Sequence, residues 1–133
     1  MLSKTSLQVV KALVELSKLP KGRSEGAVSI ARKIKAPQNY LGKILQSLAY
    51  EGLVVSQKGF NGGFRLAKDS AAITLFDVVD LIDDISGWKN CFLGKKQCSS
   101  GTACAVHKHW GKIRDSYIDF LKKTTLKNLR RDS

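Results

Sequence analysis

Two short apolar stripes of helical spacing, separated by only a few residues, lie in the first third of the chain. Both follow the i, i+3, i+4, i+7 spacing of an amphipathic helix with one face to bury. Their members are Ala27, Ile30, Ala31 and Ile34, followed by Leu41, Ile44, Leu45 and Leu48. Pro37 lies between the stripes, where the first turn of a helix tolerates a proline. The chain is therefore expected to contain two amphipathic helices joined by a tight turn.

A β-hairpin is expected directly after the second of these helices. Residues 53–57 and 64–66 have the composition of strands. Between them, Gly59, Gly62 and Gly63 supply the positive φ angles that a tight hairpin tip requires. Two helices joined by a tight turn and followed by a hairpin form a winged helix-turn-helix. We therefore predict a mostly α fold with a β-hairpin wing.

Three further helices are expected around this unit. One follows a Thr5-x-x-Gln8 capping signal, and another begins at a signal made by Thr74 and Asp77. The last carries apolar residues at the spacing of a helix-helix seam, namely Trp110, Ile113, Tyr117, Phe120, Leu121 and Thr124. We expect this long helix to pair with a second copy of the chain, with packing inside its own chain as the alternative. Residues 126–133 are expected to form a frayed basic tail.

The balance of charge indicates a polyanionic partner. Lys and Arg number 23 against 11 Asp and Glu, so the net charge is +12. Amides can address adenine edges, whereas tyrosine, lysine and arginine side chains can bond phosphates or enter a minor groove. The candidate DNA-binding residues, four at the start of the second helix and two on the wing, are Gln38, Asn39, Tyr40, Lys43, Lys58 and Arg65. A solvated helical hairpin and a solvated wing are the alternatives.

The cysteines of the chain form the second candidate site. Cys91, Cys98 and Cys104 lie in one short stretch that His107 follows. An odd number of thiols in a reducing compartment argues against a disulfide framework. Three thiolates and an imidazole can complete the ligand shell of an iron-sulfur cluster or of a zinc ion. Three free thiols without a metal would instead form a redox sensor, so all three interpretations stay open.

Other classes of protein are disfavoured. No apolar run approaches the roughly 18–20 residues that cross a bilayer, and the polar start of the chain does not resemble a signal peptide. We therefore expect a cytoplasmic protein that is not associated with a membrane. Asp80, Asp83 and Asp84 make one helix face acidic, which suggests either a solvated face or an acid-base or cation site. No nucleophile-base constellation occurs elsewhere, so we do not expect an enzyme.

Several segments together resemble the Rrf-two (Rrf2) family of bacterial winged-helix transcription regulators. They are Tyr40-Leu41, Glu51-Gly52-Leu53-Val54, Gly62-Gly63-Phe64-Arg65-Leu66-Ala67 and Ile73-Thr74-Leu75. The resemblance covers nearly the whole chain and implies a homodimeric regulator, which we take to be a repressor, on a palindromic double-stranded operator. It also implies that recognition helices lie in major grooves and wings at adjacent minor grooves. Gly42 and Lys58 depart from residues frequent in the family, so no operator sequence is carried over.

The order Cys, Cys, Cys-x-x-His resembles the 2Fe-2S site of IscR-type members of this family, in which the histidine is a ligand. The resemblance implies a cluster held by Cys91, Cys98, Cys104 and His107 that senses iron-sulfur status, nitric oxide or redox stress. This chain has one extra residue between the first two cysteines. NsrR-type members use an N-terminal aspartate as the fourth ligand of a 4Fe-4S cluster, where this chain offers Ser6. A 2Fe-2S cluster is therefore favoured over 4Fe-4S.

These features divide the chain into three parts. Residues 1–86 form the DNA-binding winged helix-turn-helix, residues 87–107 the cysteine-rich cluster-binding loop, and residues 108–133 the dimerisation helix with the basic tail. Two other functions fit the same residues. One is a zinc Cys3His module that binds single-stranded RNA, and the other is a cluster-free thiol redox sensor on the same winged helix.

Overall fold

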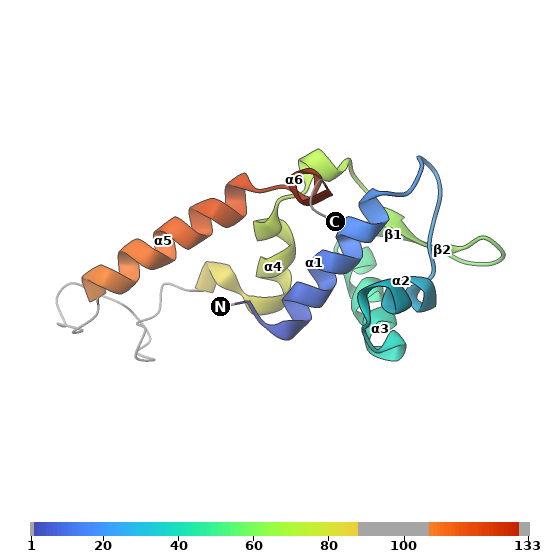
Figure 1. Cartoon of the computed structure of the whole chain (residues 1–133), viewed down its shortest axis with the longest axis horizontal. Coiled ribbons are helices and arrows are strands. Elements are labelled where there is room, and N and C mark those ends of the chain that lie inside the picture. Colours follow the sequence, from blue (N-terminus) through green and yellow to red (C-terminus); the bar gives the residue numbers. More distant parts are fainter. Residues whose placement is uncertain (1, 88–106, 131–133) are drawn as a thin grey trace.

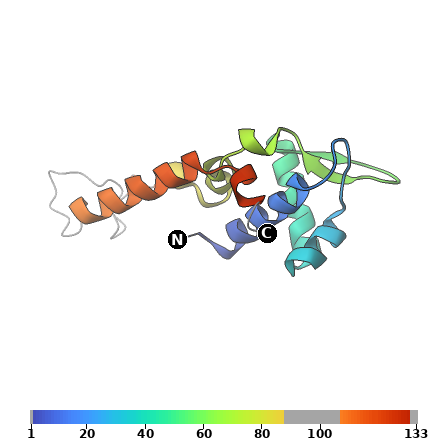
Figure 2. The same ribbon diagram turned by 45° about the horizontal axis from the view of Figure 1, so that its top comes forward.

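The computed structural model describes residues 2–87 and 107–130. The elements in chain order are α1 (Lys4–Ser17), α2 (Ala27–Ile34), α3 (Gln38–Tyr50), β1 (Val54–Gln57), β2 (Gly63–Leu66), η1 (Ser70–Ala72), α4 (Leu75–Asp83), η2 (Ile85–Gly87), α5 (His107–Lys123) and α6 (Leu126–Arg130). The predicted winged helix-turn-helix is confirmed, because α2 and α3 are followed by the antiparallel hairpin β1-β2. Figures 1 and 2 show that the hairpin and α5 extend from the body in opposite directions.

The hydrophobic core forms where the apolar stripes of the helices meet. Fully buried side chains come from α1, α2, α3 and α4, and include Leu13, Ile30, Leu45 and Val78. Burial of a side chain of this size contributes about 1.5–3 kcal/mol to folding, which outweighs the weak helix propensity of a segment as short as α2. The core therefore fixes the outward face of α3 relative to the wing.

The start of α1 is tied to the end of α4. We predicted a cap at Thr5, but the N-cap is Ser3, whose side-chain oxygen accepts a hydrogen bond from the backbone N–H of Ser6 at 3.1 Å. The Asp83 carboxylate accepts further hydrogen bonds from the Ser3 N–H at 3.1 Å and from the Ser6 hydroxyl at 2.8 Å. A carboxylate at a helix N-terminus also interacts favourably with the helix dipole. These interactions favour a helix that begins after Ser3 and not after Thr5. The capping signal at Thr74 and Asp77 is confirmed.

The wing is hydrogen-bonded to Glu25, which lies two residues before α2. Glu25 and Phe64 exchange two backbone hydrogen bonds, of 2.9 and 2.8 Å, and so form an isolated bridge beside β2. Gly63 makes this approach possible, because its φ is +137° and a Cβ there would lie 2.5 Å from the Glu25 carbonyl carbon. Both the backbone conformation and the missing side chain are therefore required at Gly63.

The C-terminal residues are part of the fold. We expected a frayed basic tail after residue 125, but Leu126–Arg130 forms α6, which packs on α1. Leu126 is fully buried, and its N–H donates to the Ile73 carbonyl at 3.0 Å. The Asn128 side chain accepts from the Thr125 N–H at 2.8 Å, which caps this short helix. Three of the five residues of α6 are polar, so the apolar side of this short helix was not evident in the sequence.

The seam that we predicted on α5 is divided between two environments. Leu121 is fully buried in the core and Tyr117 packs against it, so this part follows the intramolecular alternative. Ile113 and Phe120 are 56% and 52% exposed and lie on a helix face that the described residues leave uncovered. Among the helices of residues 2–87 and 107–130, none is long and apolar enough to cross a membrane.

Replacement of Gly63 by alanine is expected to destabilise the protein. A positive φ costs a residue with a side chain about 1–3 kcal/mol, and the collision with Glu25 adds to that cost. Urea denaturation followed by circular dichroism measures the loss. Gly111→Ala is the matched control, because the nearest atom to its new Cβ is 3.9 Å away and alanine favours a helix by about 0.5–1 kcal/mol. An unchanged unfolding midpoint in Gly63→Ala would contradict the role of the bridge.

Candidate nucleic-acid interface

The first turn of α3 presents the predicted recognition residues to solvent. Gln38, Asn39, Tyr40 and Lys43 are all exposed, whereas the opposite face of α3 is buried. Helix α3 begins after Pro37 without a side-chain cap, so no capping side chain accepts a hydrogen bond from its first backbone N–H groups. Unpaired N–H groups and the positive end of the helix dipole attract phosphate. This turn therefore combines two amides suited to base edges with a region of positive potential.

Tyr40 also has a structural role. Its hydroxyl forms a hydrogen bond with the Thr5 side chain and links α3 to α1, although its side chain stays 38% exposed. Gly42, two residues on, departs from the family pattern. A Cβ there would meet only Ala27 Cβ, at an ordinary contact distance of 3.6 Å, so nothing in the structure explains this glycine.

The wing carries the two other predicted contacts. Lys58 is exposed at the start of the hairpin tip. Arg65 is half-buried on β2, and one of its guanidinium nitrogens donates to the Gln57 side-chain oxygen at 3.0 Å. This cross-strand bond holds the Arg65 side chain on the wing. The structure thus places the six predicted residues in two groups, one on α3 and one on the wing.

One residue of the wing was missed by the sequence reasoning. Phe60 is 95% exposed at the hairpin tip, between Gly59 with φ +90° and Asn61 with φ +65°. Proteins that bind minor grooves often insert apolar side chains between base steps. An aromatic residue flanked by turn residues has no core to enter, and that signal in the sequence was sufficient to find it.

Glu25, next to the wing, forms an ion pair with the half-exposed Lys33. Glu25 is 9% exposed, and its carboxylate accepts hydrogen bonds from the Ser29 hydroxyl and from Lys33 Nζ, the latter at 2.8 Å. Burial by itself raises the pKa of Glu25, but the hydrogen bonds from Lys33 and Ser29 outweigh burial and lower the pKa below its ordinary value. Glu25 therefore stays charged and remains paired with Lys33, which leaves the Lys33 ammonium less available to bind DNA phosphates.

The acidic face of α4 has capping roles. Burial alone would raise the pKa of Asp83, but hydrogen bonds from Ser3 and Ser6 lower it. Asp80 accepts from the Ser86 N–H at 2.7 Å, and Asp84 from the Ser86 hydroxyl at 3.3 Å. Within the described residues, no group of three or more His, Cys, Asp or Glu side chains is placed to hold a metal. These hydrogen bonds account for carboxylates that the sequence left open as a solvated face or a cation site.

The cysteine segment lies in the sequence between η2 and α5. Cys91, Cys98 and Cys104 lie outside the described residues. His107 is the first residue of α5, and the structure describes its backbone but not its side chain. Ser6, the alternative fourth ligand, is fully buried and donates its hydroxyl hydrogen to Asp83.

The sequence matches known transcription regulators. The model of the Rrf2 family, described as an iron-dependent transcriptional regulator, matches residues 2–132. An HTH-type transcriptional regulator of Aquifex aeolicus is 37% identical over 102 residues, which are 75% of this chain and 71% of the relative. IscR of Vibrio cholerae is 36% identical over 95 residues, which are 71% of this chain and 54% of the relative. The chain therefore spans about half the length of the IscR relatives that it matches.

Solved structures show the same fold. CymR, the global cysteine regulator of B. subtilis, has a TM-score of 0.83 and 25% sequence identity, covering 100% of this chain and 98% of CymR. IscR of T. potens has a TM-score of 0.79 and 21% identity, covering 99% of this chain and 87% of IscR. An oxidized form of Staphylococcus aureus CymR has a TM-score of 0.78 and 23% identity, with coverage of 98% and 95%. Both the IscR and the CymR structures thus match almost the full described fold.

Proposed function

Since the chain belongs to the Rrf2 family of helix-turn-helix transcription regulators, we propose that it is a homodimeric repressor whose operator binding is controlled by an iron-sulfur cluster. The exposed start of α3, followed in the chain by a wing with two basic residues, carries the DNA-binding part of this proposal. The relatives are regulators and not enzymes, which agrees with the non-enzymatic function expected from the sequence. The same relatives favour duplex DNA over the single-stranded RNA considered above.

In this proposal, α3 reads base edges and the wing contacts the backbone. Gln38 and Asn39 enter the major groove, where a side-chain amide can pair with adenine in a bidentate manner. Tyr40, Lys43, Lys58 and Arg65 bond phosphates. Phe60 supplies an apolar contact in the adjacent minor groove. The high positive charge then adds sequence-independent affinity that decreases with salt.

Asn39→Ala and Lys58→Ala are expected to weaken DNA binding in different ways. Asn39→Ala should lose about 1–3 kcal/mol of discrimination between an operator and random duplex, because a bidentate base contact disappears. Lys58→Ala should weaken both duplexes alike and reduce the salt slope by about one. Fluorescence anisotropy at several salt concentrations, with an operator selected from a random library, separates the two. Lys112→Gln on α5 is the control for lost charge.

Equal affinity of the wild-type protein for the selected operator and for random duplex would refute base recognition by α3. Phe60→Ala completes the series. It should lower affinity for both duplexes without changing the salt slope, because the lost contact is apolar.

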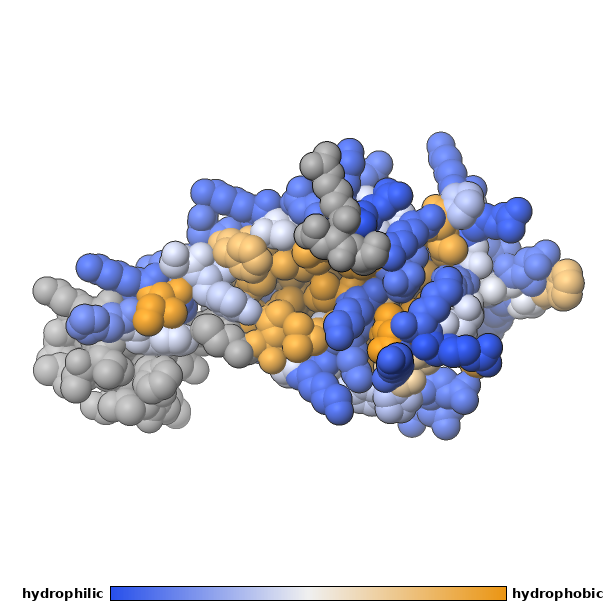
Figure 3. All heavy atoms as spheres, viewed as in Figure 1, coloured by the Kyte–Doolittle hydropathy of each residue, from blue (hydrophilic) through white to orange (hydrophobic). Residues whose placement is uncertain are grey.

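A second copy of the chain is proposed to cover the exposed face of α5. Figure 3 shows apolar side chains gathered over α1, α4 and the C-terminal end of α5, which lies against the body of the molecule. The large exposed apolar residues on these helices are Leu7, Leu81, Ile113 and Phe120. An uncovered apolar face of this kind marks an interface, and a two-fold dimer would set two recognition helices against two half-sites of a palindrome.

The variant Ile113→Glu/Phe120→Glu is expected to be monomeric. Two carboxylates buried against a partner without counter-charges cost several kcal/mol. Sedimentation velocity at micromolar concentration measures the change in mass, and duplex binding should weaken with it. Tyr50→Glu is the control, because Tyr50 is 91% exposed at the other end of the molecule. A wild-type protein that already sediments as a monomer would exclude this interface.

The donors proposed to hold the cluster are Cys91, Cys98, Cys104 and His107. Three thiolates and an imidazole are a chemically suitable set for a 2Fe-2S cluster. When bound, the cluster supplies redox and ligand-exchange chemistry at the point where the chain leaves η2 for α5. The 4Fe-4S alternative with Ser6 is disfavoured, because Ser6 is buried and bonded to Asp83.

A cluster-free thiol sensor is the second candidate function. The observation that favours it is the similarity to CymR, a cysteine regulator whose Staphylococcus aureus form has been solved oxidized. In that case Cys91, Cys98 and Cys104 would change oxidation state directly.

Anaerobic purification with iron and sulfide analysis distinguishes the two functions. Each Cys→Ala substitution should abolish visible absorbance, and His107→Ala should abolish or labilise it, whereas Ser6→Ala should preserve it.

Holo and apo dimers should differ at least about tenfold in operator affinity, which is about 1.4 kcal/mol of coupling. A colourless protein whose affinity responds to thiol oxidation would support the second candidate. Equal affinities of holo and apo protein would reject control by the cluster.

A further inference from the structure

We propose that an open basic pocket behind the wing binds a small organic phosphate. The pocket lies between the end of α1, the α1-α2 loop, β2, the loop to η1 and α6, and has a volume of about 610 Å³. Pockets of about 300–1,000 Å³ commonly hold small ligands. None of the recognition residues of α3 lines it, and Arg65 is the one proposed DNA contact that also lines the pocket.

The pocket concentrates positive charge. Its cationic side chains are Lys21, Arg23, Arg65, Lys68 and Arg130. Lys21, Arg23 and Lys68 form no ion pair with any carboxylate of residues 2–87 and 107–130. Asp69 is the acidic lining residue, and its carboxylate accepts a hydrogen bond from the Ala71 N–H at 2.8 Å as the cap of η1. A bound anion would relieve the repulsion among these cations.

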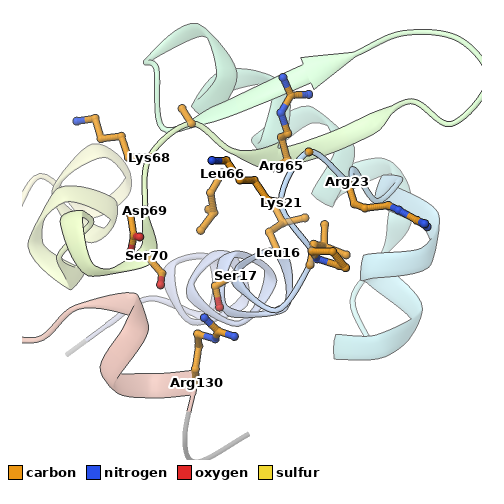
Figure 4. Close-up of a pocket in the computed structure, with 14 residues that line it drawn as sticks. Leu16, Ser17, Lys21, Arg23, Arg65, Leu66, Lys68, Asp69, Ser70 and Arg130 are labelled. Carbon is orange, nitrogen blue, oxygen red and sulfur yellow. The ribbon is translucent and has the colours of Figure 1, made fainter.

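The side chains surround the opening from several directions. Figure 4 shows Lys21 reaching across the opening toward Leu66 and Arg130 approaching Ser17 from the α6 side. In the same view the charged ends of Arg23, Arg65 and Lys68 point outward from the rim, so Lys21 and Arg130 are the cations directed into the opening. A guanidinium group can donate two parallel hydrogen bonds to two oxygens of one phosphate, and a lysine ammonium adds a mobile point charge. Lys21 and Arg130 can therefore approach one phosphate group in the opening, and the cations at the rim add positive potential around it.

The rest of the lining selects against a bare inorganic ion. Apolar side chains of Leu16, Leu19, Pro20 and Leu66 form part of the wall. Such a wall favours a ligand with a hydrocarbon or ring portion next to its phosphate, because apolar surface leaves water on binding. It is also less suited to the DNA backbone, in which charged phosphates and sugars follow one another without a separate apolar body.

Isothermal titration calorimetry of the full chain with phenyl phosphate and with inorganic phosphate, at constant ionic strength, tests the proposal. Phenyl phosphate should bind at least about fivefold more tightly, which is about 1 kcal/mol. Lys21→Gln should weaken phenyl phosphate at least about fivefold, and Lys21→Gln/Arg23→Gln further. Both residues lie on an exposed loop, so these variants should keep the wild-type unfolding midpoint. Lys112→Gln removes the same charge on α5 and should change the affinity less than about twofold.

Three results would overturn the proposal. One is the absence of phenyl phosphate binding at millimolar concentrations. Another is an equal loss in Lys112→Gln, which would reveal general electrostatic attraction. The third is a loss of duplex DNA affinity in Lys21→Gln with unchanged phenyl phosphate affinity, because Lys21 would then belong to the DNA-binding surface. The proposal is independent of cluster binding, so failure of one leaves the other intact.

Discussion

The backbone pairing of Glu25 with Phe64 is the constraint on which the proposed DNA-binding surface depends. It joins the wing to the chain two residues before α2, and α2 packs directly on α3. Val54 and Phe64 also bury the hairpin against the core, with β1 on α3 and β2 on α1, and the pairing adds backbone hydrogen bonds to a two-stranded hairpin that would be marginally stable in water alone. The pairing therefore sets the separation between the amides of α3 and the cations of the wing. The ion pair between the buried Glu25 carboxylate and the half-exposed Lys33 adds a side-chain contact at the same junction.

Much of this fold is readable from the sequence because its signals are local. The stripes of α2 and α3, the glycine-rich tip and the capping box at Thr74 each depend on residues only a few positions apart. Their outcome is determined by periodicity and turn chemistry, which a sequence displays directly. The winged helix-turn-helix and the exposure of Gln38 and Asn39 followed from those signals.

The features that sequence reasoning missed depend on contacts between distant residues. The cap of α1 moved from Thr5 to Ser3 because Asp83, eighty positions away, bonds Ser3 and Ser6. Helix α6 was concealed by its basic residues, since its order comes from the burial of Leu126 and from packing on α1 and η1. The basic pocket likewise gathers Lys21, Arg65 and Arg130 from three separate segments. No periodicity within one segment encodes such meetings.

The placement of α6 also bears on how the chain reaches its native state. Leu121 and Leu126 complete a core whose other members begin at Val9, so contacts that close the fold span more than a hundred residues. Contacts of high sequence separation require large loops to close before they add stability, which slows folding. During synthesis, the DNA-reading half cannot finish its core until α6 has emerged from the ribosome. A nascent chain that stops before Leu121 would carry an open apolar cleft, a surface that chaperones and proteases recognise.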